Sequence, residues 1–233
     1  MLRSRLRSFA MKVILLDIEG TTTPISFVYD VLFPYARAHV RESLAAEDIE
    51  ALRISYESDL RNSVSPPAWS DLPVAYVHWL MDQDRKTTAL KNLQGKIWLT
   101  GYQQGALQGA VFEDVPLALE RWHQEGMDVR IYSSGSKLAQ KLLFSSTKSG
   151  DLTKFLNGYF DTTSGPKTES ESYALISREF ACGAAEILFV SDVVRELDAA
   201  RTAGMQTALC IRPGNHPQVP GTHRSISSFE AIA

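Results

Sequence analysis

Hydrophobic residues follow two different patterns along the chain. From residue 24 to residue 105 they recur at helical spacing, and nothing in this segment has the alternation of a strand. The pattern predicts helices over 27–44, 47–60, 74–83 and 88–104. A helical run of this length is best explained as a small bundle inserted after the first strand, in which Trp69, Trp79 and Trp98 are expected to pack.

The rest of the chain alternates short apolar runs with amphipathic stretches. The runs predict strands at 13–16, 127–132, 187–190 and 206–211, and a short extended segment at 159–161. Helices are expected between them, over 115–125, 137–144, 168–180 and 194–203. This alternation predicts an α/β fold with a doubly wound parallel sheet. Residues 11–23 and 106–233 would form the sheet domain, and residues 24–105 the helical one.

Composition narrows the class of protein. The chain has 233 residues, 44% of them hydrophobic, and a net charge of −3, which gives no reason to expect nucleic acid or an anionic membrane as partner. No apolar run approaches the roughly 20 residues that span a bilayer. The two cysteines, Cys182 and Cys210, are expected in the core of a cytoplasmic protein without disulfides. Residues 1–10, basic and free of acids, are expected to be a disordered extension.

Two carboxylates follow the first strand directly. Asp17 and Glu19 stand one residue apart, and Gly20 after them allows a sharp turn. Acids this close favour a bound cation or a shared proton. The alternative is that one of them only caps the next helix.

Polar residues also end the other predicted strands. Parallel strands end on one edge of a doubly wound sheet, so Asp17 and Glu19 should meet Ser133, Ser134 and Asp192 there. Lys167, just before a predicted helix, should lie at the same edge. Acids from two strands can hold Mg²⁺, and serines with a helix N-terminus can hold phosphate. A lysine would neutralise the transferring group, and a carboxylate could attack phosphorus.

The ordered set Asp17-Ile18-Glu19-Gly20-Thr21-Thr22, Ser133, Lys167 and Ser191-Asp192 resembles the four motifs of the haloacid dehalogenase superfamily. Within it, the strings 16–25, 131–136, 167–173 and 212–215 are similar to the enolase-phosphatase of methionine salvage. The usual phosphatase motif has aspartate where this chain has Glu19. The resemblance covers residues 12–230 and implies a Rossmann-like core with the helical insertion as a cap that closes over the active site.

The resemblance also implies an activity. Such an enzyme enolises 2,3-diketo-5-methylthiopentyl-1-phosphate and then hydrolyses the phosphate to give the acireductone 1,2-dihydroxy-3-keto-5-methylthiopentene. It would act as a monomer with one Mg²⁺ per subunit. Asp17 and Asp192 would bind the metal through their side chains, and Glu19 belongs to the metal group, its position contributing a backbone carbonyl. Ser133, Ser134 and Lys167 would contact the substrate.

The expected catalytic residues are Asp17, Glu19 and Lys167. Asp17 would attack phosphorus, Lys167 would offset charge, and Glu19 would protonate the leaving oxygen and then activate water. Glu19 could instead serve the enolisation, for which the sequence identifies no base. The role of Glu196, four residues after Asp192, stays open between the active site and solvent.

Three other functions compete with this one. A generic magnesium-dependent phosphatase of the same superfamily would release phosphate without enolisation. Asp192 and Glu19 argue against a dehalogenase, because that chemistry needs no metal. An intact nucleophile and lysine argue against a catalytically dead binding module.

Overall fold

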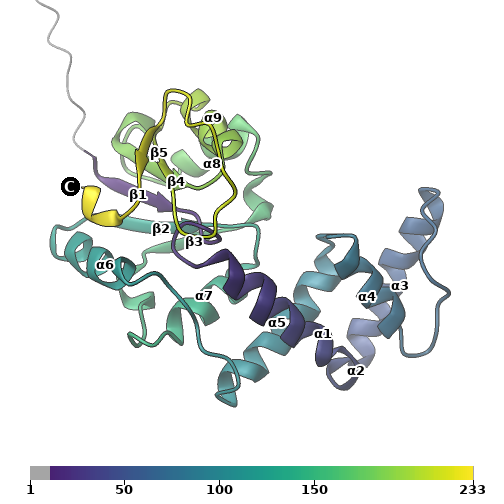
Figure 1. The fold of residues 1–233 in the computed structure, drawn as a ribbon. Helices are drawn as coiled ribbons and strands as arrows, with labels where there is room; N and C mark the ends of the chain where they lie inside the picture. The colour runs from purple at the N-terminus through teal and green to yellow at the C-terminus, as the bar shows by residue number, and fades with distance from the viewer. Residues whose placement is uncertain (1–10, 233) are drawn as a thin grey trace, which may run out of the picture.

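Six parallel strands form one sheet in the part of the chain that the computed structural model describes, residues 11–232. Their order is β3-β2-β1-β4-β5-β6 (Figure 1). The strands are β1 (Val13–Leu16), β2 (Asp128–Tyr132), β3 (Gly158–Phe160), β4 (Ile187–Ser191), β5 (Gln206–Cys210) and β6 (Arg224–Ile226). This arrangement confirms the doubly wound α/β fold. The expected extension at residues 1–10 lies outside the described residues.

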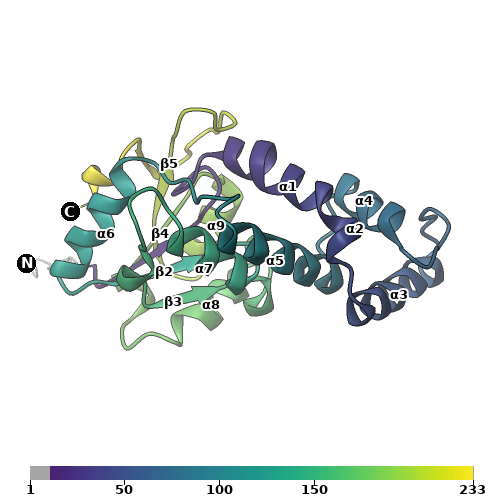
Figure 2. The same ribbon diagram turned by 90° about the horizontal axis from the view of Figure 1, so that it is seen from below.

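Helices cover both faces of the sheet and form a separate body beside it (Figures 1 and 2). The core helices are α6 (Asp114–Gln124), α7 (Lys137–Ser145), α8 (Ser170–Ser177) and α9 (Val194–Thr202), with short 3₁₀ turns η2 (Thr153–Phe155), η3 (Thr162–Ser164), η4 (Ala184–Glu186) and η5 (Phe229–Ala231). The cap comprises a π-helical turn η1 (Phe27–Leu32) and the helices α1 (Phe33–Ala38), α2 (Val40–Ser43), α3 (Ala46–Arg61), α4 (Val74–Asp82) and α5 (Thr88–Gln103).

Strand β1 lies at the centre of the sheet because its side chains are apolar on both faces. Ile14 and Leu16 belong to the hydrophobic cluster that includes residues of α6 and α7. Val13 and Leu15 belong to a second cluster with residues of α8 and α9. A parallel strand buried on both faces is expected to be such a continuous apolar run.

The register of the central strands decides where polar side chains emerge. Leu16 of β1 pairs with Ile131 of β2 and with Val190 of β4. The residues that follow these three positions therefore leave the sheet at the same edge, which is the carboxyl edge where α/β proteins bind ligands.

The first cap helix differs from the sequence prediction. Instead of one helix over 27–44, the chain forms η1, α1 and α2 in succession. Pro34 at the start of α1 has no N–H to donate to the preceding turn, which interrupts a regular α-helix. The indole Nε1 of Trp98 donates to the carbonyl of Leu32, 2.8 Å away, at the junction of η1 and α1.

Three further differences are small. The helix predicted over 168–180 extends only from Ser170 to Ser177, and the three-residue strand β6 was not predicted because its pattern is too short to recognise. Cys210 is buried as expected, but Cys182 is only partly buried at the margin of the core, and both thiols are free. Among residues 11–232, no helix is long and apolar enough to cross a membrane.

Candidate active site

The turn after β1 places Asp17 and Gly20 at the carboxyl edge. The amides of Thr21, Thr22 and Thr23 all donate to the carbonyl of Ile18, which winds the chain tightly. Gly20 has a φ of +71°, a region that favours glycine. A Cβ on Gly20 would collide with the carboxylate of Asp192 and lie 2.9 Å from the Asn215 Oδ1.

Lys167 forms the electrostatic centre of the site. The residue is 7% exposed, and its amine makes an ion pair with the Oδ1 of Asp17 and lies 2.7 Å from the Oε2 of Glu196. Tyr173 donates to the backbone carbonyl of Lys167 at 2.7 Å and fixes the loop before α8. Burial opposes charging of the amine, but the two carboxylates outweigh it and raise the pKa of Lys167 above its ordinary value.

Glu196 belongs to this site, which the sequence left open. The hydroxyl of Ser191 donates to the Oε2 of Glu196 at 2.9 Å and accepts from the amide of Val193 at 3.1 Å. Burial and the charge of Asp17 raise the pKa of Glu196 to about 7, against the attraction of Lys167. Glu196 is therefore a second carboxylate partner of Lys167, in addition to Asp17. Its position five residues after Ser191, in the first turn of α9, was the only signal in the sequence.

Oxygen ligands converge beside Gly20. Asp192 is buried, and burial together with the charges of Asp17 and Glu196 raises its pKa to about 7. The Oδ1 of Asn215 is buried without a hydrogen-bond partner, while its amide nitrogen donates to the carbonyl of Gly20 at 2.9 Å. Two carboxylates that repel each other and a free amide oxygen suit a hard cation such as Mg²⁺. Within residues 11–232, no three acidic, histidine or cysteine side chains are grouped as metal ligands, so amide or backbone oxygens would complete this set.

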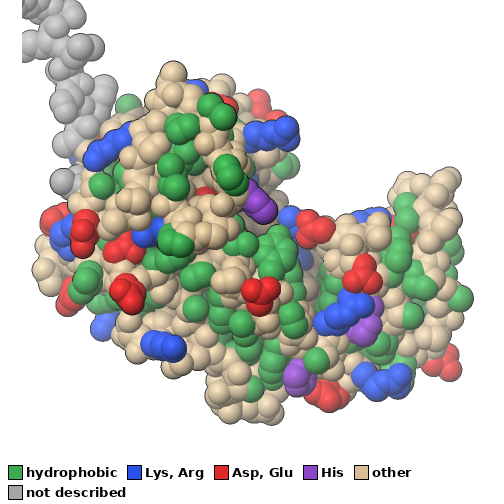
Figure 3. Space-filling view, in the orientation of Figure 1, with side chains coloured by type: hydrophobic (Ala, Val, Ile, Leu, Met, Phe, Trp, Pro, Cys, Tyr) green, Lys and Arg blue, Asp and Glu red, His purple; other side chains and the backbone are tan. Residues whose placement is uncertain are grey.

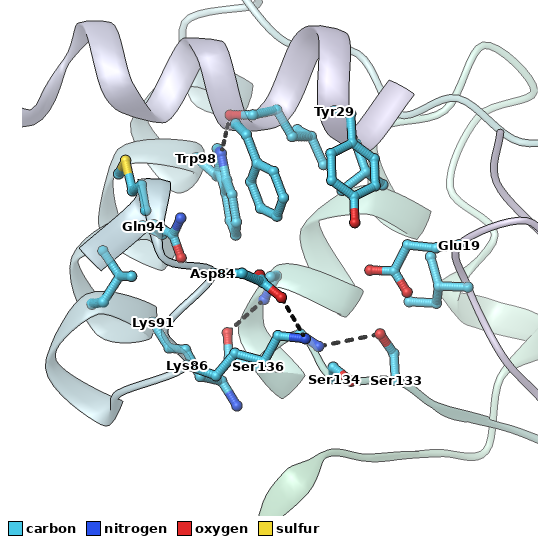
Figure 4. Close-up of a pocket in the computed structure, with 18 of the residues that line it drawn as sticks. Glu19, Tyr29, Asp84, Lys86, Lys91, Gln94, Trp98, Ser133, Ser134 and Ser136 are labelled. Carbon is cyan, nitrogen blue, oxygen red and sulfur yellow. Dashed lines mark hydrogen bonds and ion pairs between the residues drawn. The ribbon is translucent and has the colours of Figure 1, made fainter. Parts of the chain in front are cut away.

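A cavity of about 470 Å³ separates the sheet edge from the cap. Its core wall includes Glu19, Ser133 and Ser134, whereas Asp17, Lys167 and Asp192 do not line it (Figure 4). The carboxylate of Glu19 points into this cavity, and burial and the charge of Asp17 raise its pKa above the ordinary value. The molecular surface is hollowed between core and cap (Figure 3). The structure thus brings Asp17 together with Lys167, and places Glu19 and the two serines on the open side.

The cap wall of the cavity was not predicted residue by residue. Its apolar residues include Leu32, Phe33, Met81, Leu90 and Trp98, and charged residues such as Arg37, Asp84 and Lys86 line it as well. The rings of Phe33 and Trp98 stack with centroids 6.3 Å apart. Trp98 therefore packs in the cap as expected, but it also lines the cavity, a role that the sequence did not suggest.

The fold and this cluster define a class of protein. A family model described as haloacid dehalogenase-like hydrolase matches residues 11–204. Solved structures agree: the UTR4 protein of Saccharomyces cerevisiae has a TM-score of 0.78 and 37% identity, covering 95% of this chain and all of that one. A magnesium-bound HAD-hydrolase, YfnB of Bacillus subtilis, has a TM-score of 0.58 at 13% identity over 96% of this chain and 97% of that one, a likeness of fold alone.

Curated relatives narrow the class. The enolase-phosphatase E1 of Synechococcus elongatus is 46% identical over 96% of this chain and 98% of its own length. A probable bifunctional methylthioribulose-1-phosphate dehydratase/enolase-phosphatase E1 of Sorghum bicolor is 50% identical over 95% of this chain but 47% of its own. The chain spans about half the length of such plant relatives. It belongs to the haloacid dehalogenase-like hydrolases and, within them, to the enolase-phosphatase E1 family.

Proposed function

We propose that this enzyme converts 2,3-diketo-5-methylthiopentyl-1-phosphate, through its enol, to the acireductone and phosphate in methionine salvage. One observation supports this above others: the cavity has two unlike ends. Glu19, Ser133 and Ser134 make its core wall polar, next to the ion pair of Asp17 and Lys167. On the cap side, Leu32, Phe33, Met81, Leu90 and Trp98 supply apolar surface that suits a methylthio tail, beside the charged residues of the loop between α4 and α5.

Mg²⁺ is the proposed cofactor, one per chain. The side chains of Asp17 and Asp192 and the backbone carbonyl of Glu19 would hold it, with the Asn215 Oδ1 close by. Its chemistry there is to neutralise phosphoryl oxygens and to polarise a neighbouring carbonyl group.

The residues of this chain then divide the hydrolysis between them. The carboxylate of Asp17 attacks phosphorus and forms an aspartyl-phosphate, while Lys167 neutralises the phosphoryl charge and Ser133 and Ser134 orient its oxygens. Glu196 keeps Lys167 charged and in place. The half-buried Glu19, whose pKa is raised, can hold the proton that the leaving oxygen requires and can then accept one from water.

Glu19 also suits the preceding enolisation. This step removes a proton from C1, the carbon that carries the phosphate. Glu19 is the acid of the motif whose carboxylate points into the cavity, whereas Asp17 is occupied by Lys167. Glu19 would therefore act in both half-reactions in turn, first as base and then as acid.

The test follows two signals in one mixture. Synthetic diketone phosphate is mixed with enzyme and Mg²⁺, the enol is followed by its ultraviolet absorbance, and phosphate by a coupled dye. Enol that appears before phosphate supports the proposal. Phosphate release from general esters, with no enol from the diketone, would instead indicate a generic phosphatase of this superfamily.

The localisation, oligomeric state and partners of the enzyme stay predictions. We expect a cytoplasmic monomer that acts on a small phosphate ester, with neither nucleic acid nor a membrane as partner. The division into a core of residues 11–23 and 106–233 and a cap of residues 24–105 is likewise proposed as the functional one.

A further inference from the structure

The loop between α4 and α5 forms part of the cavity wall. Asp84, Arg85 and Lys86 of this loop all line it. Asp84 has a φ of +46°, a left-handed conformation that is uncommon outside glycine. The amide of Arg85 donates to the carbonyl of Leu80 at 2.9 Å, which ties the loop to the end of α4. The loop therefore has one defined backbone conformation at the cavity wall.

An ion pair with a buried carboxylate anchors this loop to α3. Arg85 Nη2 lies 2.5 Å from the Oδ1 of Asp59, a residue of α3 that is 4% exposed. The hydroxyl of Tyr76 donates to the other carboxylate oxygen of Asp59 at 2.8 Å, and the guanidinium lies 5.8 Å from the ring centroid of Trp79. The pair resists disruption because loss of Arg85 would leave the buried carboxylate of Asp59 without its ion-pair partner.

Lys86 is the next residue and extends the other way. Its side chain is directed toward Ser133 and Ser134 on the core wall (Figure 4). The ion pair recorded for its amine is the loose one with Asp84, at 3.4 Å. The amine is therefore available to an anionic or carbonyl oxygen of a bound molecule.

The position of Lys86 selects the part of the substrate that it would meet. The phosphoryl group belongs near Asp17 and Lys167, and the methylthio tail belongs against apolar cap residues such as Phe33. A side chain that comes from the cap and reaches toward the serines would meet the substrate just beyond its phosphoryl group. In the proposed substrate, this part is the dicarbonyl.

We infer that Lys86 is a catalytic residue of the enolisation, donating to the oxygen on C2, and that Asp59 and Arg85 are its positioning pair. This inference rests on the proposed function. In the step, Glu19 takes the proton from C1, the C–H electron pair forms the C1=C2 bond, and the carbonyl pair moves onto the oxygen beside Lys86. That oxygen takes up a proton from water and Glu19 releases one, so that one proton moves from carbon to oxygen overall.

The experiment compares two assays across a double-mutant cycle. One assay follows enol formation from synthetic diketone phosphate, and the other follows p-nitrophenyl phosphate, which cannot enolise. Lys86→Met should lower kcat for enol formation by ~100-fold, the loss that follows removal of one donor to a developing oxyanion. It should change p-nitrophenyl phosphate hydrolysis by no more than about 3-fold, and Lys86→Arg should restore part of the enol signal.

The cycle then tests the positioning pair. Asp59→Asn should lower enol formation about 10-fold in the parent enzyme but less than 2-fold in the Lys86→Met background, because contacts that share one function do not add. Arg85→Gln, at a partly exposed residue, provides the same test if Asp59→Asn folds poorly. Asp48→Asn is the matched control: it breaks another ion pair of a buried cap carboxylate, with Lys96 at 2.7 Å, away from the cavity.

The outcomes are distinguishable. A parent enzyme that makes no enol overturns the proposed function and this inference together. With a parent enzyme that does make enol, equal losses in both assays for Lys86→Met would make Lys86 a phosphate ligand and overturn the inference. A loss for Asp59→Asn that is the same in both backgrounds, or is matched by Asp48→Asn, would reduce Asp59 to a structural residue.

Discussion

Lys167 and Asp17 lie 150 residues apart in the sequence and form a buried ion pair at the carboxyl edge of the sheet. Asp17 follows the central strand, while Lys167 is fixed by the loop before α8. The carboxylate is thus buried beside a fixed cation, away from bulk water. A desolvated anion beside a fixed cation is a suitable nucleophile for a phosphate ester.

Replacement of the proposed nucleophile tests this reading. We expect Asp17→Asn to lower phosphate release by at least about 1,000-fold, within the range seen when a nucleophile is removed. Enol formation should persist in part, so the enol phosphate should accumulate in a single-turnover experiment. Asp128→Asn, which alters a partly exposed ion pair with Arg130 elsewhere, is the control. Normal turnover by Asp17→Asn would exclude the aspartyl-phosphate route.

Glu19→Gln tests whether Glu19 serves both half-reactions. Because Glu19 is proposed as base and as acid, both enol formation and phosphate release should fall by ~100-fold or more, with little change in KM. The measurement is the same two-signal assay, run under steady-state conditions. Loss of the enol signal with unchanged hydrolysis of p-nitrophenyl phosphate would confine Glu19 to the enolisation.

The sequence could predict the part of this site that follows from strand ends. Asp17, Ser133 and Asp192 end neighbouring parallel strands, so their convergence follows from topology alone. Glu196 and Asn215 could not be assigned, because they reach the site through the packing of α9 and of the segment after β5. Lys86 and Trp98 depend on how the cap lies over the sheet, and no local pattern encodes that. The interruption at Pro34 hid η1 inside an otherwise regular helical pattern.

Asp192 should make the metal-free protein less stable as the pH rises. Its pKa is about 7 in the folded state, above the ordinary value of 3.8, so the folded protein binds this proton more tightly than the unfolded chain. The free energy of unfolding that this proton contributes is lost as the pH rises from about 4 to about 7. Without metal, we expect Asp192→Asn to be more stable than the parent at pH 8 by a few kcal/mol, at about 1.4 kcal/mol per pKa unit. The two should converge near pH 4, and urea titrations at both pH values measure the difference.

Magnesium should offset part of this instability of the parent protein. A cation held by Asp17 and Asp192 binds only the folded state and stabilises it by about 2.7 kcal/mol at 100 times its Kd. At pH 8, thermal denaturation with and without Mg²⁺ should therefore show a clear rise in Tm for the parent and none for Asp192→Asn. An equal rise in both proteins would mean that the ion binds elsewhere.

Gly20→Ala should destroy the site, whereas Gly126→Ala should only strain the backbone. The two glycines have nearly the same left-handed conformation, with φ of +71° and +73°. Each substitution should cost about 1–2 kcal/mol of folding free energy for placing a side chain in that region. A Cβ on Gly126 meets nothing within 4 Å, but one on Gly20 would displace Asp192 and approach Asn215.

The matched pair therefore separates strain from chemistry. We expect both variants to lose stability in urea titrations, Gly20→Ala more because of its clash with Asp192, with phosphate release and the Mg²⁺-dependent rise in Tm lost only in Gly20→Ala. If both variants kept their activity, the carboxylate of Asp192 could be displaced without effect, and the proposed cation site beside Gly20 would be wrong. If Gly126→Ala lost activity as well, backbone strain alone would account for the result at Gly20.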